Sequence, residues 1–278
     1  MWYHTDTLQG HRPYNEDRTH IVCNINNECK NYKEINYYGL FDGHGGDHVS
    51  KYLKQYLGSY FISEFVNYDL KKNSNINKYI TKVYDTIQNK LVHYELPSRN
   101  TGSTALVSLI YKNNNKPYLK VINLGDCRII GCASGCTRNN IAMPLSKDHK
   151  PKSFEEYNRI IKLNGKIEQE KGDEPRVKGM AVSRSFGDLD ATPEVTHKPD
   201  IYDYNLLDYK FIVMGCDGLY DVLSNQDIVD FVLNQIEPNN YKDNYTTRSK
   251  NNIATKLINF AFKSGSQDNI TAIIIFLE

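Results

Sequence analysis

The stretch Phe41–Gly46, which reads Phe-Asp-Gly-His-Gly-Gly, brings together residue types that could carry out chemistry. The carboxylate of Asp42 and the main-chain carbonyl of Gly43 are oxygen ligands of the kind that hard divalent cations prefer. The imidazole of His44 gains or loses a proton near neutral pH. A glycine-rich surface turn would have the same composition, so this stretch alone indicates either a turn or a metal site.

Three further aspartates occupy comparable turns beside apolar, strand-like runs: Asp126, Asp217 and Asp268. Any one of them would be an ordinary turn residue, because Asp and Gly are common in turns. Strands that end at one rim of a sheet can bring such turns together in space. With the adjacent pair Glu16 and Asp17, the four aspartates therefore predict an acidic cluster.

A cluster of carboxylates with one backbone oxygen, and without a Cys or His ligand set, suits Mg²⁺ or Mn²⁺ rather than Zn²⁺. Two such ions about 4 Å apart would bridge a water and activate it for in-line attack on phosphorus. The nearby Arg12 has a planar guanidinium that suits a phosphate or a carboxylate. Taken locally, Arg12 and its acidic neighbours also fit a solvated charge cluster.

Apolar periodicity predicts the elements that would position these turns. Strands are expected at 34–41, 103–111, 118–124, 127–133, 209–215 and 270–277. Helices are expected after Gly46, at about 76–95, at 154–163, after Ser224 and at about 250–263. Capping-box spacing marks two helix starts, Ser153 with Glu156 and Ser224 with Asp227. The strands 103–111, 118–124 and 127–133 are expected to form an antiparallel meander.

The composition is that of an ordinary globular chain. Of 278 residues, 40% are apolar and 24% are charged, and no linker divides the sequence, so we expect one domain over residues 1–278. The net charge of +1 gives no reason to expect nucleic acid or a membrane surface as a partner. No run of about 18 apolar residues could span a membrane, and the N-terminus lacks a signal-peptide pattern.

Cysteine usage favours a reducing compartment. The six cysteines form neither a CxxC pair nor a disulfide framework: Cys23, Cys29, Cys127, Cys132, Cys136 and Cys216. We therefore expect an intracellular location, cytoplasmic or nuclear.

A series of short motifs follows the same order along nearly the whole chain. They are Arg12-x3-Glu16-Asp17, Phe41-Asp-Gly-His-Gly-Gly46, Thr101-Gly-Ser-Thr104, Leu124-Gly-Asp126, Asp148-His-Lys-Pro151, Ala181-Val-Ser-Arg184 with Gly187-Asp188, Cys216-Asp-Gly218 with Asp221, and Asp268-Asn269. Several are weak individually, but in this order they are very specific. The chain resembles the metal-dependent serine/threonine protein phosphatases of the protein phosphatase 2C type.

This resemblance implies an α+β fold, a four-layer α-β-β-α sandwich in which two antiparallel β-sheets are flanked by helices. It implies a protein phosphatase that acts on phosphoserine and phosphothreonine in proteins. The expected cofactors are two Mg²⁺ or Mn²⁺ ions per site, with a position for a third. The expected partners are phosphorylated proteins, without nucleic acid or membrane, and the expected state is a monomer.

The resemblance also implies which residues surround the metals. Those expected as ligands are Asp42, which would bridge both ions, Asp217 and Asp268 on the first, and the Gly43 carbonyl on the second. Those expected around them are Glu16 and Asp17, which would hold metal-bound waters, and Asp126 and Asp221, with Asp126 at the position of the third, looser metal.

Two further residues are expected to act on the phosphoryl group itself. Arg12 would bind the phosphate, and together with the metals it would neutralise the phosphoryl oxygens in the transition state. His44 would act as a general acid on the leaving serine or threonine oxygen, because an alkoxide is a poor leaving group. The attacking group would be a hydroxide that bridges the two metals, so no covalent phosphoenzyme is required.

Three alternatives compete with this interpretation. The run Cys132 to Arg138 fits the C-x5-R pattern of cysteine phosphatases, although it has one glycine and no helix-like sequence after it. A catalytically weak binding module of the same fold would be expected to lack a metal carboxylate, and none is missing. A metal-dependent phosphohydrolase of small phosphate esters would have the same metal ligands.

Overall fold

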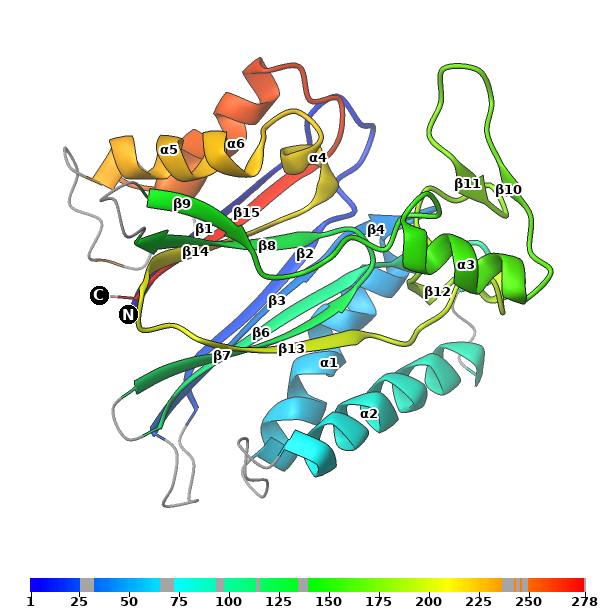
Figure 1. The fold of residues 1–278 in the computed structure, drawn as a ribbon, viewed down its shortest axis with the longest axis horizontal. Coiled ribbons are helices and arrows are strands. Elements are labelled where there is room, and N and C mark those ends of the chain that lie inside the picture. The colour runs from blue at the N-terminus through cyan, green and yellow to red at the C-terminus, as the bar shows by residue number, and fades with distance from the viewer. Residues whose placement is uncertain are drawn as a thin grey trace. The chain divides into compact units, whose positions relative to one another are not determined.

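The computed structural model describes residues 1–25, 33–65, 73–93, 98–113, 116–134, 140–236, 243, 246 and 250–277 (Figure 1). The chain divides into two compact units. The first unit contains Met1–Asp17, Cys127–Lys147 and Asn205–Glu278, and the second contains Arg18–Asp126 and Asp148–Tyr204. The single catalytic domain over residues 1–278 stays a prediction.

The first unit is built on a five-stranded antiparallel sheet in the order β1-β15-β14-β8-β9. Its strands are β1 (Trp2–Leu8), β15 (Ile270–Phe276), β14 (Tyr209–Gly215), β8 (Arg128–Ser134) and β9 (Asn140–Pro144). Every residue of β15 is buried, which accounts for its nearly continuous apolar sequence.

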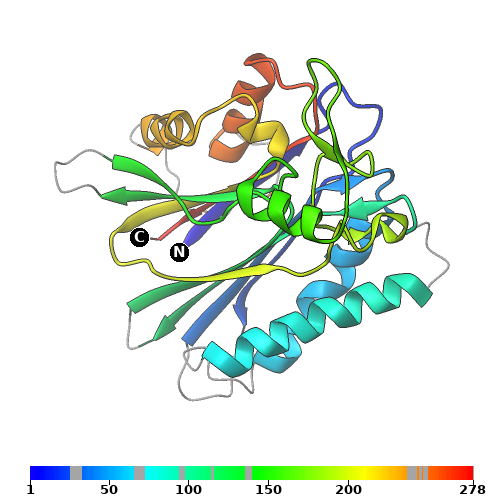
Figure 2. The same ribbon diagram turned by 45° about the vertical axis from the view of Figure 1, so that its right-hand side comes forward.

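Three helices belong to the first unit: α4 (Asp217–Tyr220), α5 (Asn225–Ile236) and α6 (Ile253–Lys263). Figures 1 and 2 show α5 and α6 against one face of the sheet. Their apolar stripes supply Val229 and Leu257 to a core that also contains Val213 and Ile274 of the strands. Burial of these side chains is the main force that holds the helices on the sheet.

The second unit has its own five-stranded antiparallel sheet, in the order β13-β7-β6-β3-β2. The strands are β13 (Asp200–Asn205), β7 (Lys116–Leu124), β6 (Ala105–Asn113), β3 (Lys33–Phe41) and β2 (Arg18–Ile25). Helices α1 (His48–Phe65) and α2 (Asn73–His93) pack on one face of this sheet (Figure 1). The shared core includes Leu53 of α1, Ile87 of α2 and Val107 of β6.

Smaller elements complete the second unit. Strands β12 (Phe186–Gly187), β5 (Gly102–Ser103) and β4 (Gly43–His44) form a three-stranded sheet in that order. Strands β10 (Ile167–Glu168) and β11 (Arg176–Val177) form a hairpin. Helix α3 (Phe154–Lys162) and a 3₁₀ turn at Leu189–Ala191 complete the described elements.

The predicted meander is wrong in its third strand. β6 and β7 pair as expected. The other neighbour of β7 in the sheet is β13, however, and β8 belongs to the sheet of the first unit. The turn between β7 and β8 does not close a hairpin. Gly125 has φ +106°, its N–H donates to His149 Nδ1 over 3.1 Å, and its carbonyl accepts the His149 N–H over 3.0 Å. The backbone groups of this turn are therefore used by His149 instead of a neighbouring strand.

Only one of the two predicted capping boxes is present. Ser224 Oγ donates to Asp227 Oδ2 over 2.6 Å, and the Asp227 N–H donates to Ser224 Oγ over 3.2 Å, at the start of α5. Ser153 makes no side-chain cap, because its hydroxyl donates to the Asp148 carbonyl. The buried Glu156 instead accepts hydrogen bonds from two arginines, which the spacing does not reveal.

Ser224→Ala is expected to destabilise the protein by about 1 kcal/mol. The substitution removes the hydroxyl that accepts a hydrogen bond from the Asp227 N–H in the first turn of α5. Ser153→Ala serves as the matched control, since that serine precedes a helix without capping it. Urea unfolding of both variants measures the difference. Equal losses for the two variants would contradict this account of the α5 cap.

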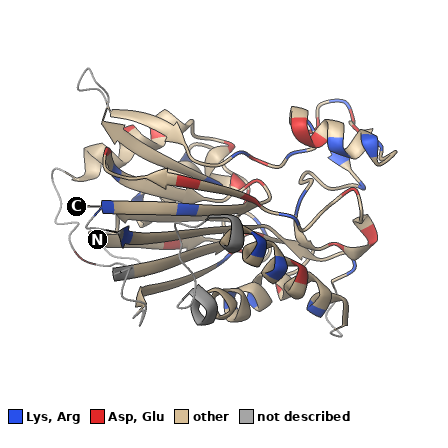
Figure 3. Ribbon diagram, turned by 60° about the horizontal axis from the view of Figure 1, so that its bottom comes forward, with Lys and Arg blue, Asp and Glu red and all other residues tan. Residues whose placement is uncertain are grey.

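Several described elements were not predicted from the sequence, among them β1, β9, β13 and α4. Cys29, Cys136 and Arg138 lie outside the described residues. No helix in the described parts of the chain is long and apolar enough to cross a membrane. Lys and Arg are interspersed with Asp and Glu along the ribbon in Figure 3, in agreement with the net charge of +1.

Candidate active site

In the first unit, Asp217 and Asp268 lie at the same end of the sheet. Gly215, the last residue of β14, is paired with Ala272 of β15. Asp217 follows β14 after Cys216, as the first residue of α4, and Asp268 precedes β15. The antiparallel register therefore brings both turns to one rim, as the sequence predicted for strand-end carboxylates.

Asp17 is the buried member of this group. Its side chain is 3% exposed, and its Oδ2 accepts a hydrogen bond of 2.6 Å from Thr271 Oγ1 of β15. The pKa of Asp17 is raised to about 7, chiefly by burial and also by the negative charges of Asp217 and Asp268, although hydrogen bonds from Thr271 and Cys216 lower it. A buried carboxylate beside two further carboxylates forms a site that favours a cation.

The donor chemistry of this group fits Mg²⁺ or Mn²⁺. Asp17, Asp217 and Asp268 offer carboxylate oxygens, the ligands that these hard cations prefer. The neighbouring thiol of Cys216 is already engaged, because it donates to the Asn269 carbonyl and accepts the Thr271 N–H over 3.2 Å. The chemistry of the site is therefore that of an oxygen-ligand metal centre.

Arg12 contacts one of the predicted ligands. Its Nη2 lies 2.6 Å from Asp268 Oδ2, and its side chain is 57% exposed. The side chain of Gln9 donates to the carbonyls of Arg12 and Pro13, which fixes the backbone of the loop. Arg12 is thus accessible from solvent and held beside the acidic group.

Asn269 holds the loop that carries Arg12 and Glu16. Its Oδ1 accepts the Glu16 N–H over 2.8 Å, and its Nδ2 donates to the carbonyls of Gln9 and Tyr14. The sequence showed Asn269 only as part of a motif, and its clamping contacts were not predicted. Asp221 is exposed at the end of α4, where its N–H donates to the Asp217 carbonyl over 2.8 Å.

In the second unit, Asp42 and Asp126 also lie at one end of a sheet. Asp42 follows β3 and Asp126 follows the Gly125 turn after β7, and β6 joins these two strands in register. The Asp42 N–H donates to Thr104 Oγ1 over 3.1 Å, and the Asp42 carbonyl accepts the Thr104 N–H over 2.9 Å. Asp126 is 3% exposed, and Lys150 Nζ lies 3.7 Å from its Oδ2.

Gly43 and His44 form β4, so the residue predicted to supply a carbonyl and the residue predicted to supply a proton are neighbours on one strand. His44 Nε2 lies 2.7 Å from Asp188 Oδ2. The predicted site residues thus gather in two groups, Arg12, Glu16, Asp17, Asp217, Asp221 and Asp268 in the first unit, and Asp42, Gly43, His44 and Asp126 in the second. Their roles stay predictions.

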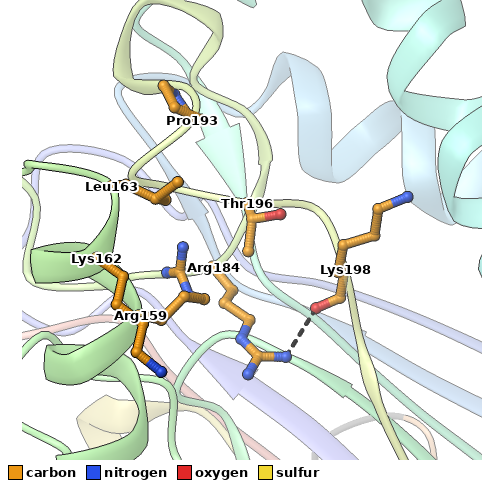
Figure 4. A pocket seen from close by; sticks show the side chains of 7 residues that line it. All are labelled: Arg159, Lys162, Leu163, Arg184, Pro193, Thr196 and Lys198. Atoms are coloured by element: carbon orange, nitrogen blue, oxygen red, sulfur yellow. Dashed lines mark hydrogen bonds between the residues drawn. The ribbon is translucent and has the colours of Figure 1, made fainter.

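A pocket of about 490 Å³ lies in the second unit, beside α3 (Figure 4). Arg159 and Arg184 line it, and both donate to the buried carboxylate of Glu156. Arg184 Nη1 also donates to the Lys198 carbonyl over 2.9 Å, the dashed contact in Figure 4. Both guanidiniums have structural partners, so their presence in the pocket does not require a ligand.

The cysteine-phosphatase alternative fails at Cys132. This residue is fully buried in β8, and burial raises the pKa of its thiol to about 11. A thiol with such a pKa is protonated at neutral pH and is a poor nucleophile. The match to the C-x5-R pattern is therefore accidental.

Comparison with known proteins identifies the family. A model of the family described as Protein phosphatase 2C matches residues 3–270. The chain belongs to the protein phosphatase 2C family. Among its relatives, a PP2C-like domain-containing protein of Acanthamoeba polyphaga mimivirus is 42% identical over 175 residues, which are 58% of this chain and 94% of that protein.

Other similar proteins extend over the whole chain. Probable protein phosphatase 2C 11 of Arabidopsis thaliana is 33% identical over 99% of this chain, which spans 66% of that protein. The solved structure of a serine-threonine phosphatase 2C from Toxoplasma gondii has a TM-score of 0.81 at 20% identity, over 99% of this chain and 94% of that one. The predicted fold class, the α+β sheet sandwich of protein phosphatases 2C, is confirmed, and so is the predicted enzyme class, serine/threonine protein phosphatase.

Proposed function

We propose that this protein phosphatase 2C removes phosphate from phosphoserine and phosphothreonine with the aid of two Mg²⁺ or Mn²⁺ ions and a third, looser one. The observation that carries this proposal is that Asp217 and Asp268 lie at one rim of the sheet beside the buried Asp17, whose carboxylate their charges disfavour and a divalent cation would favour. Bound cations would lower the pKa of a water held between them and draw negative charge from the phosphoryl oxygens.

The ligands for these cations are the residues predicted from the sequence. Asp42 would bridge the ions, Asp217 and Asp268 would hold the first, and the Gly43 carbonyl would hold the second. Glu16 and Asp17 would accept hydrogen bonds from water in the site. Asp126 would serve the third ion, and Asp221 would lie around the metals. Gly43 in β4 suits this role because it has no side chain, which lets an ion approach its main-chain carbonyl closely.

Arg12 would bind the phosphoryl group of the substrate. In the ion pair with Asp268 it is held at 2.6 Å, so phosphate binding would exchange one oxyanion partner for another. The guanidinium presents its donors in a planar fork that matches a phosphate. Because Asn269 and Gln9 fix the loop backbone, Arg12 would reach the substrate from a defined position.

His44 would give a proton to the departing serine or threonine oxygen. General acid catalysis of this kind contributes roughly 10²–10⁴-fold, and the benefit is greatest for a poor leaving group. The imidazole is 32% exposed at the side-chain level, so it is open to a substrate. No observation favours a binding module or a hydrolase of small esters over a protein phosphatase. The monomeric state, the intracellular location and the lack of a nucleic-acid partner stay predictions.

Phosphate release from phosphoserine, phosphothreonine and phosphotyrosine peptides tests the proposal. We expect release from the first two peptides with Mn²⁺ or Mg²⁺, loss of release with chelator, and recovery when the ion is restored. Cys132→Ser is the control variant and is expected to keep its activity. Release that ignores the chelator and requires Cys132 would overturn the proposal.

A further inference from the structure

The small sheet β12-β5-β4 places His44 beside a residue that has no assigned role in the reaction. In β5, Gly102 is paired with His44 on one side and with Gly187 on the other. Asp188 follows Gly187 directly, and its side chain meets the imidazole of His44 next to Gly102. All of these residues belong to the second unit.

Asp188 is buried and held in a fixed position. Its side chain is 3% exposed, its N–H donates to the Thr101 carbonyl over 3.1 Å, and its Oδ2 accepts the hydroxyl of Ser185. Its φ is +46°, a left-handed conformation that costs free energy for a residue other than glycine. The surrounding contacts therefore have to impose this geometry.

Two neighbours hold the backbone on which Asp188 depends. The buried side chain of Gln88 on α2 accepts the Gly187 N–H over 3.0 Å and donates to the Gly187 carbonyl over 2.9 Å. Gly102 supplies the necessary space. A Cβ atom at that position would lie 2.0 Å from Asp188 Oδ2 and 2.5 Å from His44 Nε2. A side chain at residue 102 would thus break the contact between the two groups.

The contact has a defined donor and acceptor. Asp188 Oδ2 already accepts the Ser185 hydroxyl, and an ionised carboxylate can only accept hydrogen bonds. With Asp188 ionised, His44 Nε2 is therefore the donor in the 2.7 Å contact. The carboxylate fixes both the orientation of the ring and the nitrogen that keeps this proton.

We propose that Asp188, supported by Ser185, is the positioning residue for the general acid His44. This inference rests on the proposed role of His44 in protonating the leaving group. A ring that is already oriented loses less conformational freedom when it reaches the transition state. An aspartate that orients a catalytic imidazole in this way acts through the imidazole and does not touch the substrate.

The test compares a poor leaving group with a good one. Phenyl phosphate needs a proton on its leaving oxygen, whereas p-nitrophenyl phosphate needs it much less, because nitrophenolate is stable. We expect Asp188→Asn to lower kcat for phenyl phosphate by about 10- to 100-fold, because loss of orientation removes only part of the roughly 10²–10⁴-fold contribution of a general acid. The loss on p-nitrophenyl phosphate is expected to be smaller, with little change in KM on either substrate.

A double-mutant cycle with His44→Ala shows whether Asp188 acts through the imidazole. In the His44→Ala background, Asp188→Asn is expected to cause no further loss, because interacting residues are not additive. Additive losses of equal size on both substrates would overturn the proposal in favour of a structural role. Asp190→Asn is the matched control, since Asp190 is two residues away, 48% exposed and paired with Arg99.

The two proposals can fail separately. If His44→Ala lowers kcat by the same factor on both substrates, the general-acid role of His44 fails. If His44→Ala shows the selective loss and Asp188→Asn does not, only the positioning role fails. Should Asp188→Asn unfold, Ser185→Ala removes one support of the carboxylate and is expected to give a smaller loss with the same preference for phenyl phosphate. Equal losses in that variant would overturn the proposal.

Discussion

Asp217→Asn is expected to reduce kcat/KM for a phosphothreonine peptide by at least about 1,000-fold. Loss of a group that only orients a metal ligand already costs roughly 10- to 100-fold in affinity or activity, and removal of a direct ligand should cost more. Asparagine has the same size and keeps one oxygen, but it lacks the charge that balances the cation.

The fold is expected to survive this substitution. The negative charge of Asp217 is one of the reasons that the pKa of Asp17 is raised to about 7, after burial itself. Without that charge the buried carboxylate of Asp17 has one repulsive neighbour fewer. Asp217→Asn should therefore lose activity while its Tm without added metal stays equal to or above that of the unmodified protein.

Metal-dependent stability separates a lost ligand from other defects. A ligand that binds only the folded state raises Tm, and at a given concentration it raises Tm more the more tightly it binds. Mn²⁺ should raise the Tm of the unmodified protein clearly and that of Asp217→Asn much less. Asp230→Asn is the control, because Asp230 is an exposed residue of α5 in the same unit. If Asp217→Asn keeps more than a tenth of the activity, Asp217 is not an essential ligand.

Much of the site could be predicted because its residues stand directly at the ends of strands. An apolar run followed by Asp and Gly fixes where a strand stops, and the antiparallel register then decides which strand ends share a rim. Asp217 and Asp268 meet at one rim in this way, and Asp42 and Asp126 lie at another. The sequence carried this information locally.

Partners that are distant in sequence could not be predicted by the same reasoning. Gly125-Asp126 has the composition of a hairpin turn, yet its backbone bonds to His149, so β8 joins another sheet. Asp188 contacts His44 over 144 residues of sequence, and only the pairing of both strands with Gly102 brings them together. Neither contact leaves a periodic or compositional signal.

Glu156 is the clearest case of a residue whose position in a helix suggested the wrong partner. Its spacing from Ser153 predicts a cap, but the carboxylate is 2% exposed and lies between two arginines. Oε1 accepts two hydrogen bonds from Arg184, and Oε2 accepts two from Arg159 and one of 2.7 Å from Ser183. Arg184 also donates to Asp200 over 2.9 Å, which ties α3 to β13.

Glu156→Gln is expected to lower the free energy of unfolding at pH 7 by roughly 3–5 kcal/mol. Removal of one member of a buried ion pair leaves the other charge without compensation, which costs about this much. Here two guanidiniums lose the carboxylate that they share, although Arg184 keeps its contact with Asp200. Urea unfolding measures the effect, and Glu155→Gln is the matched control because Glu155 is the exposed neighbour on α3. A loss below about 1 kcal/mol, the size expected for a surface salt bridge, would contradict a stabilising role for the buried contacts of Glu156 with Arg159 and Arg184.

The stabilisation that Glu156 provides should depend on pH, which packing of its side chain alone would not cause. Burial would raise the pKa of Glu156, but hydrogen bonds and charges of Arg184 and Arg159 outweigh it and lower the pKa from 4.5 to about 2. A lowered pKa adds stability above pH 4.5, and this contribution is lost as the pH falls towards 2. The shift corresponds to roughly 3 kcal/mol at neutral pH.

Glutamine does not titrate, so the variant lacks this contribution at every pH. The difference in unfolding free energy between the unmodified protein and Glu156→Gln should narrow by about 2 kcal/mol between pH 7 and pH 3. Carboxylates that do not contact Arg159 or Arg184 titrate alike in both proteins and cancel in the difference. A difference that stays constant over this range would mean that Glu156 stabilises α3 by its shape and not by its charge.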